Sequence, residues 1–223
     1  STLSSSIFTS SLVSLFFFSH KPKLICRIAN VYQEPVSFFS WLELVLQRFS
    51  LKVCDGIIFN SKATESSCLH LLNSTRVKCK AQIINNPVLS NDYQQKQDGF
   101  KTGCPKKEKR LVFIGRLVPQ KRVVHTLQAF LNVSEEIPDC KLLIVGDGPE
   151  KAKVLDLIQK HQASDKVELR DFCDDVPKLL SESHCLINTS KFEGFGNVFV
   201  EGLAYCDNLI SYESIGGASE ILP

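Results

Sequence analysis

The sequence predicts an α/β fold with two domains, each built on a parallel sheet, and two observations lead to this prediction. In the second half of the 223-residue chain, short apolar runs alternate with segments whose apolar residues recur at helical spacing. The connections are short, which is typical of parallel sheets with helices on both faces and ligands beyond the carboxyl ends of the strands. A polar stretch separates this half from a less regular first half. We therefore expect a partial N-terminal domain at 1–90, a linker at 91–108 and a C-terminal domain at 109–223.

The first strand of the second half is the run KRLVFIG, which is short, apolar and ends in glycine. A helix follows it, because Val123, Leu127 and Phe130 recur on one face. Later strands are expected at 141–148, 166–172, 184–190 and 208–212, with helices around 155–158 and at 176–183 and 197–204. The first half predicts strands at 23–30 and 55–61, helices at 38–51 and 64–72, and an Asn-Pro turn ending the segment 81–88.

Composition argues against several classes of function. Hydrophobic residues make up 43% of the chain and charged residues 22%, which is ordinary for a globular protein and too apolar for a disordered one. A net charge of +2 gives no strong overall field that would argue for nucleic acid or an anionic membrane. The basic run at 106–110 is interpreted as solvated linker, with a binding patch as the alternative. None of the nine cysteines has the C-x-x-C spacing of a zinc or redox site, and free cysteines in apolar runs indicate a reducing compartment.

Two segments raise the question of membrane contact. The apolar segment 7–18 is too short to span a bilayer, which needs about 20 residues, and it lacks the flanks of a signal peptide. We interpret it as a buried strand or helix, with a dip into the membrane interface as the alternative. The aromatic residues Tyr32, Phe38, Phe39 and Trp41 are interpreted as core residues, with lipid contact as the alternative.

Two motifs of the second half follow predicted strands directly. In GRLVPQK (115–121), Gly115 ends a strand, Arg116 follows it and Lys121 begins the next helix. Two cations beside a helix N-terminus suit a diphosphate, and the alternative is that both are surface charges. The turn GDGPE (146–150) is interpreted as structural. Because it lacks the full G-x-G-x-x-G pattern, hydride transfer by a dehydrogenase is not supported.

The strongest motif is SKFEGFGNVFVE at 190–201. Glycines directly after Glu193 permit close approach of backbone N–H groups to a ligand. A helix beginning near Asn197 directs its free N–H groups to the same place. Glu201 lies about one turn into that helix, where a carboxylate can accept hydrogen bonds from two adjacent hydroxyls such as those of a ribose. One acid beside a sugar and another beside a ribose describe a nucleotide-sugar site.

Residues 109–222 resemble the donor-binding domain of the family-4 retaining glycosyltransferases, which have the GT-B fold. Four motifs carry the resemblance in family order: FIGRLVPQKRVVHTLQAF, LLIVGDGPE, SKFEGFGNVFVEGLA and GGASEIL. The first half is similar to the later part of the family's acceptor domain, through KLICRIAN, DGIIFNSKA and IINNPV. The resemblance implies two Rossmann-like domains with parallel sheets, the first domain and the end of the second being truncated in this chain.

The resemblance also implies a role for each motif residue. Arg116 and Lys121 would hold the donor diphosphate and stabilise the departing nucleotide, and Glu193 would contact the transferred sugar. Glu201 would bind the ribose. The remaining donor-binding residues would be Gly115, Phe195, Gly196, Asn197 and Val198. No metal or other cofactor is implied, because these groups neutralise the leaving diphosphate, and the predicted loops carry no D-x-D motif.

Four positions depart from the family pattern: Asp171 replaces a usual glycine, Cys206 and Asn208 replace the glycine and proline that follow EGLA, and Ala218 replaces a proline. Two hypotheses therefore stand. The first is an enzyme that moves a sugar from a nucleotide-sugar donor to a glycan or lipid-linked acceptor in cell-surface polysaccharide synthesis. The second is a truncated, inactive remnant that at most binds nucleotide. Either is expected in the cytoplasm, with peripheral contact at the inner face of the cell membrane as an open alternative.

Overall fold

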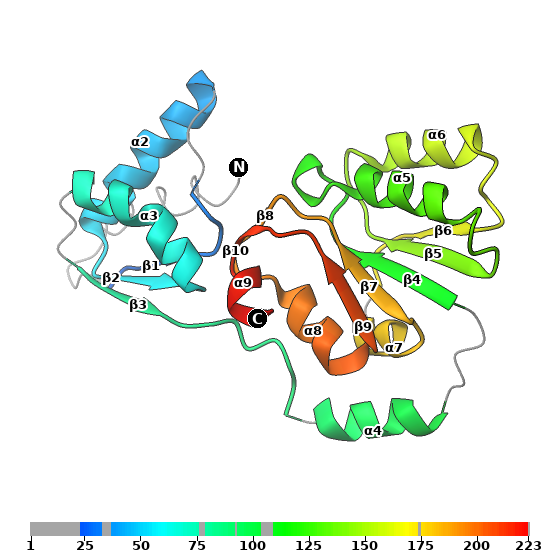
Figure 1. Cartoon of the computed structure of the whole chain (residues 1–223). Coiled ribbons are helices and arrows are strands. Elements are labelled where there is room, and N and C mark those ends of the chain that lie inside the picture. The colour runs from blue at the N-terminus through cyan, green and yellow to red at the C-terminus, as the bar shows by residue number, and fades with distance from the viewer. Residues whose placement is uncertain are drawn as a thin grey trace. The chain divides into compact units, whose positions relative to one another are not determined.

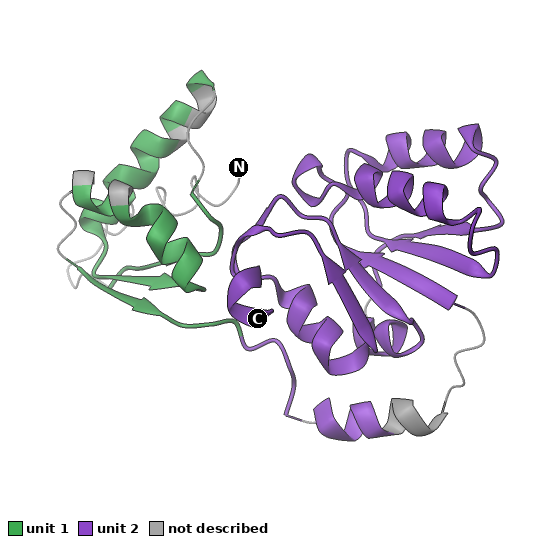
Figure 2. Cartoon of the chain, in the orientation of Figure 1, with its two compact units in different colours: residues 1–86 green, residues 87–223 purple. Residues whose placement is uncertain are grey.

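The computed structural model describes residues 23–32, 37–75, 79–91, 93–103, 109–173 and 175–222. The apolar segment 7–18 lies outside the described residues. The chain divides into two compact units, Ser1–Asn86 and Pro87–Pro223, which are green and purple in Figure 2. Figure 1 labels the helices and strands of both units.

The first unit is built on a three-stranded parallel sheet in the order β1-β2-β3. Its strands are β1 (Ile25–Ile28), β2 (Gly56–Phe59) and β3 (Lys80–Ile83), and its helices are α2 (Phe38–Val53) and α3 (Lys62–Thr75). The hydrophobic core of this unit combines Ile57 and Phe59 of the central strand with Leu44 and Leu51 of α2. The strands and helices predicted from the sequence for this half are therefore present.

The second unit is built on a five-stranded parallel sheet in the order β6-β5-β4-β7-β9. Its strands are β4 (Lys109–Ile114), β5 (Cys140–Val145), β6 (Val167–Arg170), β7 (Cys185–Asn188) and β9 (Asn208–Ser211). The helices are α4 (Tyr93–Gly103), α5 (Val123–Val133), α6 (Lys151–Lys160), α7 (Val176–Ser181), α8 (Asn197–Tyr205) and α9 (Ala218–Ile221), with a short 3₁₀ helix η1 (Pro119–Lys121). Two-residue strands β8 (Phe192–Glu193) and β10 (Ile215–Gly216) pair separately in parallel.

Helices cover both faces of the five-stranded sheet, as Figure 1 shows. Successive strand residues point to opposite faces, so Phe113 packs with α5 and α6 while its neighbour Val112 packs with α7 and α8. In β5, Leu142 and Leu143 divide between the two faces in the same way. The α/β fold with parallel sheets that the sequence predicts is confirmed, and the central strand β4 brings its following loop to the middle of the carboxyl edge.

The segment 91–108, predicted as a linker, contains the helix α4. This helix belongs to the second compact unit, because the Gln97 side-chain amide donates a hydrogen bond of 2.6 Å to the carbonyl of Ala204. Tyr93 packs against the core beneath α7 and α8. The helix is mostly polar, so its composition resembles that of a linker although its position is fixed by contacts with distant residues.

The core interpretation of the aromatic residues is wrong for two of them. Phe38 and Trp41 stack on each other with ring centroids 6.1 Å apart, and they are 70% and 52% exposed. They share one face of α2 with Leu42, Val45 and Phe49, which are also exposed, whereas Leu44 and Leu51 occupy the buried face. Tyr32 packs partly buried against the core, and the side chain of Phe39 lies outside the described residues.

Cys26, Cys140 and Cys185 lie in apolar runs of the sequence, and their free thiols are buried in the structure, where cysteine packs as a small hydrophobe. Burial raises the pKa of Cys185 to about 11, so this thiol stays protonated and poorly reactive at neutral pH. A search of the described helices finds none with the length and hydropathy needed to cross a membrane.

Candidate donor site at the carboxyl edge of the sheet

The loop after β4 carries the first three predicted site residues. Gly115 continues the strand register by donating its N–H to the carbonyl of Val145 at 3.0 Å. The aliphatic stem of Lys121 covers Gly115 so closely that a Cβ at this glycine would lie 3.7 Å from two of the lysine carbons. Arg116 is exposed, and its guanidinium has no hydrogen-bond or ion-pair partner among the residues that the structure describes. The lysine stem therefore lies across the strand end in van der Waals contact with Gly115, while the arginine stays available to a ligand.

Lys121 and Glu193 form an ion pair between the Nζ and Oε1 atoms. The pair is largely withdrawn from solvent, since the lysine and glutamate side chains are 14% and 9% exposed. Coulomb attraction is stronger in such a setting than at an open surface, and both groups are costly to leave unpaired. The alternative interpretation of Lys121 as a surface charge is therefore wrong.

Glu193 is held in place by its own backbone. Its strand β8 pairs with β10 so that Glu193 lies beside Gly216, and the N–H of Gly217 donates to its carbonyl at 3.2 Å. Both glycines approach the EGFG backbone closely: a Cβ on Gly216 would overlap the Glu193 carbonyl oxygen, and one on Gly217 would lie 2.6 Å from the Phe195 carbonyl oxygen. Only residues without a side chain fit here, so the Gly-Gly pair acts as a backbone clasp on the site.

The first turn of α8 contributes the next predicted residues. Gly196 precedes the helix with φ of 90°, a left-handed conformation that glycine adopts readily, and it receives no side-chain cap. Asn197 and Val198 begin the helix, and Phe195 is buried just before it. No side chain at the Gly196 position caps the helix, and the helix dipole makes this end suited to an anion or to hydroxyl oxygens.

Glu201 is the fifth residue of α8 and is half-buried. Burial raises the pKa of its carboxyl group above the ordinary value of 4.5. A carboxylate that is withdrawn from water and has no strong partner is stabilised when hydroxyl groups of a ligand donate hydrogen bonds to it. Among the predicted site residues, Lys121 contacts both Gly115 and Glu193.

Two neighbouring residues that the sequence analysis did not single out position the loop. The hydroxyl of Thr189, at the end of β7, donates toward the carbonyls of Lys121 and Arg122 at 2.9 and 3.0 Å. It also lies 2.9 Å from the hydroxyl of Thr126 in α5. Ser190 follows, fully buried, with a hydroxyl oxygen that has no partner among the described residues. The hydroxyls of Thr189 and Ser190 are singled out by no pattern in a single sequence, so their role in positioning the loop is seen only in the contacts of the folded chain.

The turn GDGPE is structural, as the sequence predicts. The carbonyl of Asp147 accepts the N–H of Leu117 at 2.8 Å, and the carbonyl of Leu117 accepts the N–H of Glu150 at 2.9 Å. A Cβ on Gly148 would come within 2.5 Å of the Leu117 carbonyl oxygen. The backbone of this turn therefore packs tightly against the loop after β4 and supports it.

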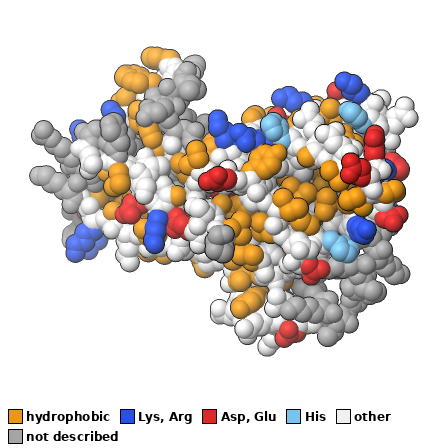
Figure 3. All heavy atoms as spheres, viewed as in Figure 1, with side chains coloured by type: hydrophobic (Ala, Val, Ile, Leu, Met, Phe, Trp, Pro, Cys, Tyr) orange, Lys and Arg blue, Asp and Glu red, His pale blue; other side chains and the backbone are white. Residues whose placement is uncertain are grey.

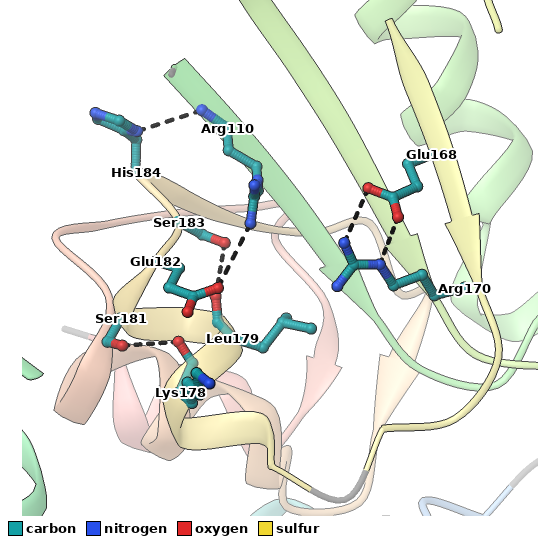
Figure 4. A network of polar contacts seen from close by, with 9 residues as sticks. All are labelled: Arg110, Glu168, Arg170, Lys178, Leu179, Ser181, Glu182, Ser183 and His184. Atoms are coloured by element: carbon teal, nitrogen blue, oxygen red, sulfur yellow. Dashed lines mark hydrogen bonds and ion pairs between the residues drawn. The ribbon is translucent and has the colours of Figure 1, made fainter. Parts of the chain in front are cut away.

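A polar network at the amino edge of the same sheet is also structural (Figure 4). The N–H of Arg110 donates to Nδ1 of His184 at 3.2 Å, and its guanidinium lies 3.7 Å from Glu182 at the end of α7. Nearby, the guanidinium of Arg170 holds the pKa of Glu168 below its ordinary range. The bonds of Arg110 fasten the end of α7 to the starts of β4 and β7, far along the strands from the candidate donor-site loops, whereas the Arg170–Glu168 pair lies on β6.

Comparison with known proteins identifies the family of this chain. The family model of "glycosyl transferases group 1" matches residues 94–223, and the chain belongs to this family. An uncharacterised glycosyltransferase of Methanocaldococcus jannaschii is 30% identical over 222 residues, which are 95% of this chain and 53% of that protein. N-acetyl-alpha-D-glucosaminyl L-malate synthase of Bacillus anthracis is 35% identical over 120 residues, which are 54% of this chain and 31% of that protein. The chain thus spans about half or less of these relatives.

Solved structures show the same fold. The Anabaena protein HepE, in complex with UDP and glucose, matches with a TM-score of 0.77 and 18% identity over 99% of this chain and 60% of its own. WaaG, a glycosyltransferase involved in lipopolysaccharide biosynthesis, matches with a TM-score of 0.73 and 15% identity over 96% of this chain and 64% of its own. The fold is therefore the parallel-sheet α/β type of GT-B glycosyltransferases.

Proposed function

We propose that this chain provides the donor site of a family-4 retaining glycosyltransferase, which moves a hexose-type sugar from a nucleotide sugar to a glycan or lipid-linked acceptor. The observation that carries the proposal is the buried pair of Lys121 and Glu193, set beside the uncapped N-terminus of α8. A cation for a diphosphate and a carboxylate for a sugar hydroxyl occur there together. Membership of the glycosyl transferases group 1 supports the reaction class.

Each site residue has a part in this proposal. Arg116 and Lys121 bind the two phosphates, and Lys121 shifts from Glu193 toward the diphosphate as the donor enters. Glu193 then accepts a hydrogen bond from a hydroxyl of the transferred sugar. Backbone N–H groups at Asn197 and Val198 meet phosphate or sugar oxygens, and Glu201 accepts the ribose hydroxyls.

The reaction follows from these contacts. The bond from the sugar's anomeric carbon to the leaving phosphate oxygen breaks, and the acceptor hydroxyl oxygen bonds to the same carbon on the same face. The acceptor's proton passes to the released diphosphate. Arg116, Lys121 and the α8 amides stabilise the negative charge that develops on the diphosphate. We propose that these groups suffice without a resident metal or other cofactor, so transfer should continue in excess chelator.

Calorimetric titration of the purified chain with UDP, GDP and ADP tests the donor site. We expect one nucleotide to bind with micromolar affinity and Arg116→Ala to weaken this binding at least tenfold. The nucleotide that binds identifies the base of the donor to use in transfer assays. The absence of binding in a folded sample contradicts the proposal. Binding without transfer to any glycan or lipid-linked acceptor, in the chain and in a full-length parent, would favour the inactive remnant that only binds nucleotide.

We further propose that the chain lies in the cytoplasm, in peripheral contact with the inner face of the cell membrane. The free buried thiols suit a reducing compartment, and the exposed apolar face of α2 provides a surface for lipid. Vesicles containing anionic lipid should retain the chain, and Phe38→Ser with Trp41→Ser should release it. Exchange of the exposed Leu155 for serine in α6 serves as the matched control. Equal retention of all three proteins would contradict membrane contact through α2.

A further inference from the structure

A pocket lies close to the candidate donor site but is lined by none of the predicted donor-site residues. Its volume is about 590 Å³, which is within the range of small-molecule pockets. Its walls come from η1, the starts of α5 and α6, and the loop that leads into β8. The polar lining residues are Gln120, Arg122, His125, Glu150, Lys153 and Lys191.

The charge of this pocket favours an anion. Arg122, Lys153 and Lys191 carry three positive charges against the single negative charge of Glu150, and His125 adds another when protonated. Basic side chains gather over η1 and the start of α5 in Figure 3. Neither α5 nor α6 has a side-chain cap at its first turn, so the positive ends of two helices of 11 and 10 residues also meet the pocket.

Glu150 favours a ligand that also carries a hydrogen-bond donor. This residue is 7% exposed, and its Oε1 atom lies 3.3 Å from the Nζ atom of Lys153. Its Oε2 atom is buried and has no partner among the residues that the structure describes. A buried carboxylate oxygen without a donor is costly, and a hydroxyl group from a ligand in the pocket would supply that donor.

The pocket wall is fixed by two hydrogen bonds that cross it. The N–H of Lys191 donates to the carbonyl of Gln120, and the side-chain amide of Gln120 donates to the carbonyl of Phe192, both at 2.8 Å. Arg122 adopts a left-handed backbone with φ of 52°, which residues with a Cβ rarely adopt. A cation kept in this conformation at the pocket wall is consistent with a ligand contact.

We propose that this pocket binds a phosphorylated sugar or polyol. Its phosphate lies among Arg122, Lys153 and Lys191, and one of its hydroxyl groups donates to Oε2 of Glu150. The phosphate satisfies the excess positive charge, and the hydroxyl satisfies the buried acid, so neither inorganic phosphate nor a neutral sugar fulfils both requirements. The proposed site shares no residue with the donor site, so its binding can be measured separately from transfer.

Titration of the full chain with glucose 6-phosphate, inorganic phosphate and glucose tests this site. Glucose 6-phosphate should bind at least tenfold more tightly than either of the others. Lys153→Ala combined with Lys191→Ala should weaken its binding at least tenfold, whereas Lys160→Ala, at the far end of α6, should leave it unchanged. Glu150→Gln should reduce the preference for glucose 6-phosphate over inorganic phosphate, and thermal melting checks that each variant folds.

Two further variants separate this site from the donor site. Arg122→Gly suits the left-handed backbone, so weaker binding in this variant reports the lost guanidinium rather than misfolding. Arg116→Ala, which lies in the donor site, should leave glucose 6-phosphate binding unchanged. The proposal is overturned if Arg116→Ala abolishes that binding, if Lys153→Ala with Lys191→Ala does not weaken it, or if glucose 6-phosphate and inorganic phosphate bind equally.

Discussion

Glu193 accepts a hydrogen bond from the ammonium group of Lys121, although the two residues lie 72 positions apart in the chain. The lysine ends η1 and the glutamate ends β8, so the pair joins the two loops that form the donor site. Without a donor, each residue serves as the other's partner. In the proposed donor site, a diphosphate would have to compete with Glu193 for Lys121, so variants of this pair test the proposal directly.

Lys121→Ala should lower the free energy of unfolding by about 3 kcal/mol, because it leaves the Glu193 carboxylate buried without a partner. Urea unfolding measures this loss. The double variant Lys121→Ala with Glu193→Ala should lose less than the sum of the single variants, with a coupling energy of about 1–3 kcal/mol. Lys191→Ala, two residues from Glu193 but exposed, should change stability by no more than about 0.5 kcal/mol. Strict additivity would contradict the pairing.

In transfer, Lys121→Ala should reduce the rate more than nucleotide affinity. The diphosphate gains negative charge as the sugar leaves, so a cation beside it stabilises the transition state more than the bound donor. Comparison of the turnover rate with the dissociation constant for the matching nucleoside diphosphate measures the two effects. If affinity falls as much as the rate does, Lys121 contributes to binding alone.

Glu201 should make both stability and nucleotide binding depend on pH. Its folded pKa lies above 4.5, so the folded chain holds the proton more tightly than the unfolded chain. Its contribution to stability is therefore largest at acid pH and falls as pH rises from 4.5 through the folded pKa. Ribose hydroxyls donate to the ionised form, so nucleotide affinity should rise over the same interval. Glu201→Gln should bind more weakly and lose this part of the pH dependence, in titrations run alongside the parent chain.

The Gly-Gly clasp gives a prediction about the backbone. Gly216→Ala should destabilise the second unit by about 2–3 kcal/mol and weaken nucleotide binding, because φ is 131° and the new Cβ would overlap the Glu193 carbonyl oxygen. Gly56→Ala is the matched control, since its Cβ would lie 3.8 Å from the nearest atom, the carbonyl oxygen of Lys80. Thermal melting and nucleotide titration compare the two variants. Equal effects would mean that the clasp does not position Glu193.

The sheet of the second unit is predictable because its strands are continuous apolar runs. The expected strand at 141–148 corresponds to β5 at Cys140–Val145, and the expected helix at 176–183 corresponds to α7 at Val176–Ser181. Buried parallel strands between helices leave this pattern in a single sequence. The α4 helix does not, because its few apolar residues show no stripe and its bond from Gln97 ends on a residue 107 positions away.

The site is predictable in its residue types but not in its contacts. Glycines and charged residues at strand ends identify Gly115, Lys121 and Glu193, and their positions follow from the parallel sheet. The sequence does not show that Glu193 pairs with Lys121 and not with Arg116, because both cations follow the same strand and only the folded structure gives their contacts. The unpartnered oxygen of Glu150 is equally hidden, because burial of one carboxylate atom has no signature in sequence.

The end of α6 offers a test of the backbone that is independent of the site. Gln162 has φ of 51°, and the bonds from Gln162 N–H to Gln159 and from Ala163 N–H to Ile158 form a Schellman motif, in which glycine is preferred at this position. Gln162→Gly should therefore raise the free energy of unfolding by up to about 1 kcal/mol, since the relief of left-handed strain exceeds the entropy that glycine adds to the unfolded chain. Gln159→Gly, inside the same helix, should lower it by about 1 kcal/mol. Urea unfolding of both variants measures the difference, and a loss of stability in both would show that α6 does not end in this conformation.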